Sequence, residues 1–182
     1  VQRELLLAKG MEIQTMTGLI QPIAIDTHQI GNTGTDYGVY LTNVLLPGML
    51  EMTVILATVF AIGSELKNGT SRAALETAGG SIGTLIVGKL FPYTVLFTAI
   101  GLTSDRVMYG LAGFPLAGQI WGIFLGTFAM ILASEAVGIF IIGMLPVLRL
   151  ATSIAALYSV LGFSLAGFTF PVEAMPPYIQ GL

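Results

Sequence analysis

The sequence predicts an all-α membrane protein, and three observations lead to that prediction. Of its 182 residues, 54% are hydrophobic and only 9% are charged, whereas a soluble domain carries roughly 25% charged residues. The charges are clustered, and long apolar stretches separate the clusters. An apolar stretch of about 20 residues matches the bilayer core, and helix is the one open-ended structure that satisfies backbone groups in lipid.

Four membrane-spanning helices are expected in the gaps between the charges. Glu51 is the only charge between residues 39 and 63, and the later stretches carry almost none. Glycines and Pro115 break the middle of the chain into two spans. The predicted spans are residues 39–63, 90–110, 118–143 and 150–170.

The first 38 residues differ from the rest. They mix short apolar and polar alternation with Gly, Asn and Pro, which indicates strands and loops of an extracytoplasmic domain. The chain begins with Val1 rather than Met, so we expect a fragment that holds only the tail of that domain. His28, the single histidine, has no partner at metal-ligand spacing, and we expect it at the surface.

The basic residues predict how the spans are oriented. Basic connections stay in the cytoplasm, which places residues 64–89 and 144–150 inside. Residues 111–117, the N-terminal segment and the C-terminal end are then outside. Arg106 conflicts with this pattern, and we expect pairing with Asp105 and snorkelling to hold it. The basic residues of the two inner connections are Lys67, Arg72, Lys89 and Arg149.

Residues 83–90, GTLIVGKL, superficially resemble a phosphate-binding P-loop. A P-loop needs Ser or Thr directly after its lysine, because that hydroxyl ligates Mg²⁺. Leu90 holds that position and has no oxygen to offer. The preferred interpretation is that Lys89 anchors the cytoplasmic end of a membrane helix at the headgroups, and that this chain has no nucleotide site of its own.

The connection over residues 64–89 is long and amphipathic. Leu75, Ala78 and Ile82 recur at helical spacing among charged residues. Gly79 and Gly80 are expected to divide the stretch into two short helices. Such a segment on the cytoplasmic face either docks a partner or rests on lipid headgroups, and the spacing alone leaves both interpretations open.

The order of motifs in this connection resembles the signature of ABC-2 type transporter permeases. The residues that carry the resemblance are Glu65, Gly69-Thr70, Leu75, Thr77, Gly88-Lys89 and Pro92. The stretch AGFTFPVEAMPPYIQ, residues 166–180, is similar to the segment between the last two helices of that family. Ala78, where the family often has proline, and the charged pair Asp105-Arg106 depart from the pattern.

The resemblance implies a membrane-spanning permease subunit of an ATP-binding cassette transporter, without enzyme activity or a cofactor of its own. Its partners would be a separate ATPase subunit, a second permease subunit and the lipid bilayer, with no nucleic acid. Thr70 is expected to cap the following helix through its hydroxyl. The implied contact with the ATPase comprises Glu65, Gly69, Thr70, Arg72 and Leu75.

The resemblance also implies a location and a subgroup. In that subgroup, a large extracytoplasmic domain follows the first helix, and five more helices follow the domain. Residues 1–38 would be the tail of this domain, and residues 39–182 would hold helices two to five with an outer re-entrant segment at 171–182. The protein would be a multi-pass exporter in the cytoplasmic (inner) membrane of a bacterium.

Small and acidic residues within the spans are further candidates. Gly118, Gly122 and Gly126 form a stripe, continued loosely by Ser134 and Gly138, that lets helices approach closely. Packing inside the subunit is favoured for this stripe, and a dimer seam is second. Glu51 and Glu135 are single carboxylates in apolar helices. Each carboxylate either contacts substrate or a proton, or has a structural role as a protonated acid or as a hydrogen-bond partner of a neighbouring hydroxyl. Both interpretations are equally open for Glu51, and the structural role is favoured for Glu135.

Other function classes were weighed on the same residues. An intramembrane serine protease would need a base beside Ser164, and the single histidine lies outside the predicted bundle. The intramembrane carboxylates suit an ion-coupled secondary transporter or a channel subunit, which remains the alternative function. No motif identifies the transported substrate or the direction of transport. Nor does any motif show whether the second permease subunit is identical to this one.

Overall fold

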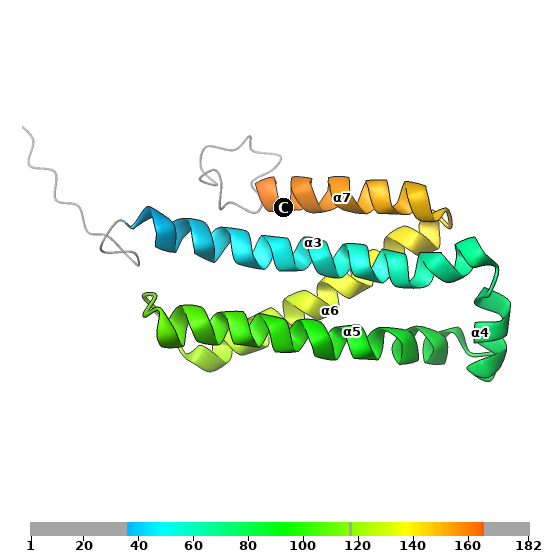
Figure 1. Ribbon diagram of the computed structural model, residues 1–182, viewed down its shortest axis with the longest axis horizontal. Coiled ribbons are helices and arrows are strands. Elements are labelled where there is room, and N and C mark those ends of the chain that lie inside the picture. The colour runs from blue at the N-terminus through cyan, green and yellow to red at the C-terminus, as the bar shows by residue number, and fades with distance from the viewer. Residues whose placement is uncertain (1–35, 117, 166–182) are drawn as a thin grey trace, which may run out of the picture. The chain divides into compact units, whose positions relative to one another are not determined.

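The computed structural model describes residues 36–116 and 118–165, and all regular structure within those ranges is helical (Figure 1). The helices are α3 (Tyr37–Asn68), α4 (Ser71–Thr77), α5 (Ile82–Asp105), the π-helical turn η1 (Arg106–Leu111), α6 (Ile120–Met144) and α7 (Leu148–Leu165). Asp36 begins α3, because its carboxylate accepts a hydrogen bond from the Gly38 N–H at 2.7 Å. The expected extracytoplasmic tail, apart from residues 36–38, and the expected re-entrant segment at 171–182 lie outside the described residues.

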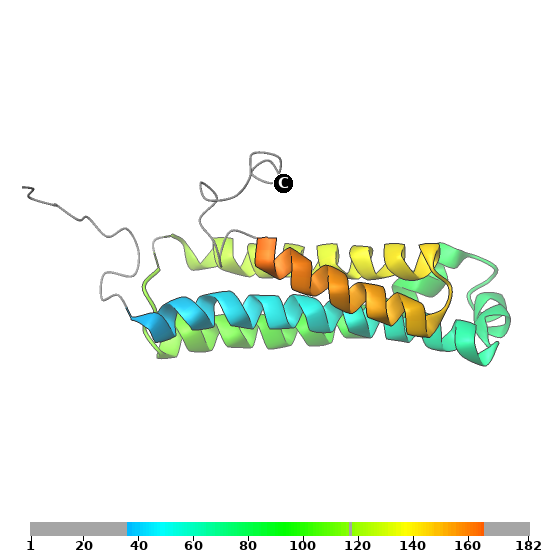
Figure 2. The same cartoon turned by 90° about the horizontal axis from the view of Figure 1, so that it is seen from above.

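The four long helices run alternately in opposite directions (Figures 1 and 2). Helix α3 packs against α5, α6 and α7. We call the end where α4 joins α3 to α5, and where α6 meets α7, the α4 end. The opposite end, where η1 follows α5, is the η1 end (Figure 1).

Three helices are long and apolar enough to cross a membrane: Tyr37–Asn68, Ile82–Leu111 and Ile120–Met144. They correspond to three of the four predicted spans, but the first two are longer than predicted. A helix of 32 residues is about 48 Å long, so α3 extends beyond a hydrocarbon core of about 30 Å. The apolar stretch Leu148–Ser164 of α7 is shorter, and the span over 150–170 stays a prediction.

Two apolar clusters on either side of α3 hold the bundle together. The first joins α3 to α6 and α7 through buried Ile55, Val59, Ile141, Ile142, Ala151 and Ala155. The second joins α3 to α5 and α6 through buried Val54, Phe97 and Ile131. Helix α3 is therefore the element on which the other three are assembled.

Close packing of α6 on α3 uses glycine at a different place from the predicted stripe. A Cβ built on Gly138 would lie 2.7 Å from the Thr58 Cβ, so the two helices touch backbone to side chain there. At Gly118, Gly122 and Gly126, a Cβ would meet no atom of the described residues within 4 Å. The favoured packing of this stripe inside the subunit is thus not found in the described part of the chain, and the dimer seam stays a prediction.

Candidate functional site

Helix α4 is positioned by a tight turn at the end of α3. Gly69 adopts a left-handed conformation, with φ +70°, which glycine tolerates without strain. The Thr70 N–H donates to the Glu65 carbonyl at 3.0 Å, and the Gly69 N–H donates to the Leu66 carbonyl at 3.4 Å. This pair of bonds is a Schellman motif, which satisfies the last carbonyls of α3 and turns the chain sharply. The predicted turn at Gly69 is confirmed.

The same motif ends α4. Gly79 and Gly80 both have positive φ, and their N–H groups donate to the Glu76 and Leu75 carbonyls at 3.1 and 2.9 Å. The predicted break at these glycines is confirmed, but the second short helix is wrong. The chain instead enters α5 directly, because the Ser81 hydroxyl caps it by accepting from the Thr84 N–H at 3.3 Å.

The predicted cap at Thr70 is also wrong. The Thr70 hydroxyl makes no capping hydrogen bond to α4. Its backbone is helical, with φ −90° and ψ −4°, whereas a capping side chain needs extended backbone to reach the helix N–H groups. The N–H of Thr70 is already used to close α3, and this keeps Thr70 in the turn.

Helix α4 has no buried residue, although it joins two membrane helices. Leu75 is half-buried, and its neighbours Arg72 and Glu76 form an ion pair at 3.5 Å with side chains that are 92% and 73% exposed. A pair so exposed contributes little to stability. Helix α4 therefore presents most of its surface outside the bundle.

Glu65 and Lys89 form an ion pair that joins α3 to α5. Their side chains are only 24% and 22% exposed. The expectation that Lys89 begins its helix is wrong, since α5 starts at Ile82. The ammonium pairs with Glu65 of α3, and its placement at the headgroups stays a prediction. The stretch GTLIVGKL lies wholly within α5, so most of its N–H groups are used along the helix rather than exposed in a loop.

The two basic connections meet at the α4 end. Lys67 of α3 and Arg149 of α7 line one pocket there, together with Pro146 and Val147 of the α6–α7 connection. The bundle thus places residues 64–89 and 144–150 on the same side, as the orientation requires. Which side of the membrane this is stays a prediction.

The two predicted intramembrane carboxylates have different surroundings. Glu135 is 6% exposed, and the Thr94 hydroxyl of α5 lies 2.9 Å from both of its oxygens. This is the favoured interpretation of Glu135, a hydrogen bond from a neighbouring hydroxyl. Glu51 is half-buried and faces Gly162 of α7, and no hydrogen bond joins its carboxylate to another described residue. Both interpretations of Glu51 remain open.

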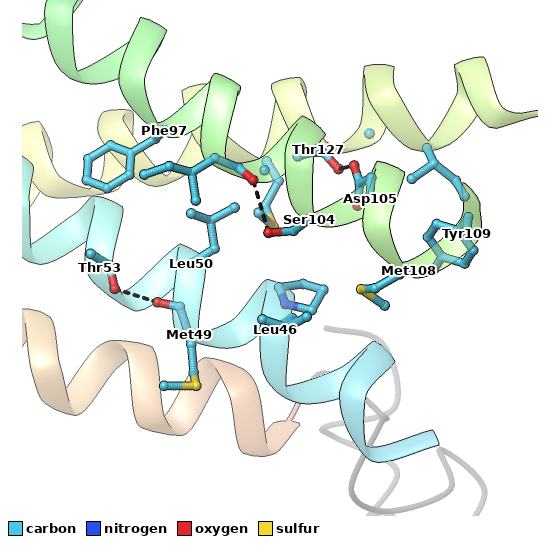
Figure 3. Close-up of a pocket in the computed structure, with 16 residues that line it drawn as sticks. Leu46, Met49, Leu50, Thr53, Phe97, Ser104, Asp105, Met108, Tyr109 and Thr127 are labelled. Carbon is cyan, nitrogen blue, oxygen red and sulfur yellow. Dashed lines mark hydrogen bonds between the residues drawn. The ribbon is translucent and has the colours of Figure 1, made fainter. Parts of the chain in front are cut away.

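A pocket of about 450 Å³ lies between α3, α5, η1 and α6 near the η1 end (Figure 3). Most of its lining is apolar; Thr53 is a polar residue at the Phe97 end, and Asp105, Tyr109 and Thr127 lie together at the other end (Figure 3). Asp105 there accepts a hydrogen bond from the Thr127 hydroxyl at 2.7 Å, and Tyr109 donates to the Asn43 side chain at 2.9 Å. The expected Asp105–Arg106 ion pair is not formed, because the Arg106 side chain runs alongside Gly110.

Two irregular helical segments border this pocket. Pro47 lies inside α3 and has no N–H, so the carbonyl of Asn43 loses its usual helical donor. The π-helical turn η1 follows Asp105 directly, and such turns are frequent at functional sites. Residue spacing in the sequence does not predict this pocket; Pro47 and the charged pair Asp105-Arg106 are the signals that could have indicated it.

Comparison with known proteins adds one finding to this geometry. The model of the ABC-2 type transporter family matches residues 1–182. Comparison with curated proteins and with solved structures gave no match. The match covers the chain, and the long apolar helices agree with a multi-pass membrane protein. The chain therefore belongs to the ABC-2 type transporter family.

Proposed function

We propose that the chain is the membrane-spanning permease subunit of an exporter, which works with a separate ATPase subunit and a second permease subunit. Family membership supports a permease role. The observation that carries the proposal is α4, a short helix with no buried residue between two membrane helices. An unburied helix held by two defined turns is suited to contact another protein.

The connections around α4 suggest how the contact is transmitted. The Schellman turn ties α4 to the last turn of α3, where Glu65 both accepts the closing backbone bond and pairs with Lys89. A displacement of α4 therefore moves α3 and α5 together. When the partner ATPase closes on ATP, it can drive transport only if the closed form favours one of two arrangements of α3 and α5 over the other.

The chain itself supplies no ATP site in this proposal. Lys89 is engaged by Glu65 within the bundle, and Leu90 provides no oxygen for Mg²⁺. ATP hydrolysis is assigned to the partner, and this chain is not an enzyme. Labelling of the purified permease by a photoreactive ATP analogue near Lys89, competed by ATP, would contradict this assignment.

The orientation and the subgroup belong to the same proposal. The α4 end faces the cytoplasm, because the basic connections converge there and basic connections remain inside. Residues 1–38 are the tail of a large extracytoplasmic domain, and the membrane is the cytoplasmic membrane of a bacterium. Transport is outward, as in the exporters whose signature the motif of this chain resembles.

The test uses the full-length permease and its ATPase, reconstituted in liposomes. Leu75→Asp places a charge on the half-buried position of α4 and is expected to abolish substrate-stimulated ATP hydrolysis and transport. Gly69→Val is expected to do the same, because φ +70° strains a β-branched residue. Glu76→Gln is the matched control on α4, with a side chain 73% exposed, and should retain both activities.

Copurification of the two subunits and thermal unfolding of the permease verify that each variant assembles and folds. If Leu75→Asp keeps both activities while Arg149→Glu in the other inner connection abolishes them, the coupling contact is on the α6–α7 connection. Transport that persists without any ATPase and follows an ion gradient would favour the secondary transporter.

A further inference from the structure

We propose that the pocket between α3, α5, η1 and α6 binds a lipophilic organic cation, whose charge is met by the carboxylate of Asp105. The inference rests on the proposed function, because it names the class of molecule that the permease would recognise. A pocket of about 450 Å³ lies within the range of drug-sized sites, roughly 300–1,000 Å³.

The shape of the pocket suits an elongated amphiphile. Phe97 marks one end and Tyr109 the other, and along α5 and η1 these positions are about 18 Å apart at 1.5 Å per residue (Figure 3). Between them the walls are formed by Leu46, Leu50, Phe97, Ile100, Met108 and Ile123. An apolar body would lie along these side chains, and its charged group would lie at the Asp105 end.

The carboxylate of Asp105 has no ion-pair partner among the described residues, since the side chain of the adjacent Arg106 runs alongside Gly110. Thr127 donates to its Oδ2 atom at 2.7 Å, and no described Lys or Arg pairs with it. Lys89, on the same helix, is about 24 Å away along the axis and is paired with Glu65. A carboxylate in a membrane helix is costly unless it finds a partner or water, so a cation in this pocket is favoured.

The walls also allow ligands of different shape. Met108 of η1 and Met130 of α6 come from separate elements and both line the pocket. Methionine has a flexible, polarisable side chain, and surfaces rich in it accept varied partners. Pro47 in α3 and the π-helical turn η1 also interrupt the regular α-helical hydrogen bonding of two of the walls. The pocket is therefore suited to a class of cations rather than to one rigid molecule.

The experiment measures binding to the full-length permease in nanodiscs, with no ATPase present. The probes are radiolabelled decyltrimethylammonium and decyl sulfonate, two amphiphiles of similar length and opposite charge, with empty nanodiscs subtracted. We expect the wild type to bind the cation in preference to the anion. Asp105→Asn, whose amide oxygen can still accept from Thr127, should weaken cation binding by about tenfold, or ~1.4 kcal/mol, without weakening the anion.

Two further variants make the result specific. Asp105→Glu keeps the charge and should keep the preference for the cation. Glu135→Gln removes a different intramembrane carboxylate, outside this pocket, and should bind as the wild type does. Equal binding of both probes by the wild type, or an equal loss of cation binding in Glu135→Gln and Asp105→Asn, would overturn the proposal.

The outcome is separable from that of the proposed function. Charge-selective binding that depends on Asp105, in a permease that shows no ATP-driven transport with any ATPase, would support the pocket and contradict the exporter. ATP-driven transport of another molecule, in a permease with no preference for the cation, would do the reverse.

Discussion

Gly138 is the position where α6 lies closest to α3, and Gly138→Ala tests that packing. A Cβ there would lie 2.7 and 2.8 Å from the Thr58 Cβ and Cγ2 atoms, and 3.1 Å from the Ile55 carbonyl oxygen. Carbon atoms in contact are normally about 3.5–4.0 Å apart, so α6 must retreat by roughly 1 Å. Thr58 is fully buried and Ile55 contributes backbone, so neither can turn away.

The cost follows from these contacts. Overpacking of this kind destabilises by about 1–3 kcal/mol. Replacing glycine by alanine inside a helix returns roughly 0.5–1 kcal/mol, so the net loss is expected at about 1–2 kcal/mol. Gly126→Ala is the matched control on the same helix, since a Cβ there meets no described atom within 4 Å. It should be neutral or stabilising by up to about 1 kcal/mol.

The assay is reversible unfolding of the purified permease by sodium dodecyl sulfate in mixed micelles, followed by circular dichroism. Gly138→Ala should unfold at a lower fraction of denaturing detergent than the wild type, and Gly126→Ala should not. A Gly138→Ala variant as stable as Gly126→Ala would refute the close approach of α6 to α3.

Two further predictions concern the α4 end. Glu65→Gln and Lys89→Met should each lower ATP-coupled transport in the liposome assay, because each leaves one charge of the ion pair without its partner. The exchange variant, with Glu65→Lys and Lys89→Glu together, should recover part of that transport. If the loss of transport in the exchange variant equals the sum of the losses in the two single variants, the two residues are not coupled. Asn68 at the α4 end and Gln119 at the η1 end are both exposed. A single cysteine at position 68 should therefore react with an impermeant maleimide only after cells are opened. A single cysteine at position 119 should react in intact cells. The opposite labelling pattern would invert the orientation.

Much of the fold follows from where the charges and glycines occur. Long uncharged stretches predicted the spans, and Gly69 and Gly79 marked turns that only left-handed backbone can make. Helix ends were harder to predict. Charges avoid lipid, so Glu65 and Lys89 each predict a helix boundary, yet the two residues pair and both helices continue past them. Pairing across the bundle depends on tertiary structure, which one charge in a sequence does not reveal.

The glycine stripe shows another limit of predicting helix packing from the sequence. Residues four apart in a helix do not share one face over several turns, because each step of four turns by about 40°. Gly126 and Gly138 are twelve residues apart and therefore point about 120° away from each other. The packing falls at Gly138 and at buried Ser134, the loose continuation of the stripe. The polar contacts at Asp105, Tyr109 and Glu135 join different helices, so their partners could not be assigned from spacing.

The Glu65–Lys89 ion pair also bears on how the chain enters the bilayer. A charged side chain on an isolated helix raises the free energy of insertion, and Glu65 and Lys89 are each carried by a helix that must insert. Inserted together, α3 and α5 form a hairpin with α4 at its tip, and the two charges neutralise one another during entry. The hairpin, rather than the single helix, is then the unit of membrane integration. The same ion pair that joins α3 to α5 in the folded bundle would also commit the two helices to one another at synthesis.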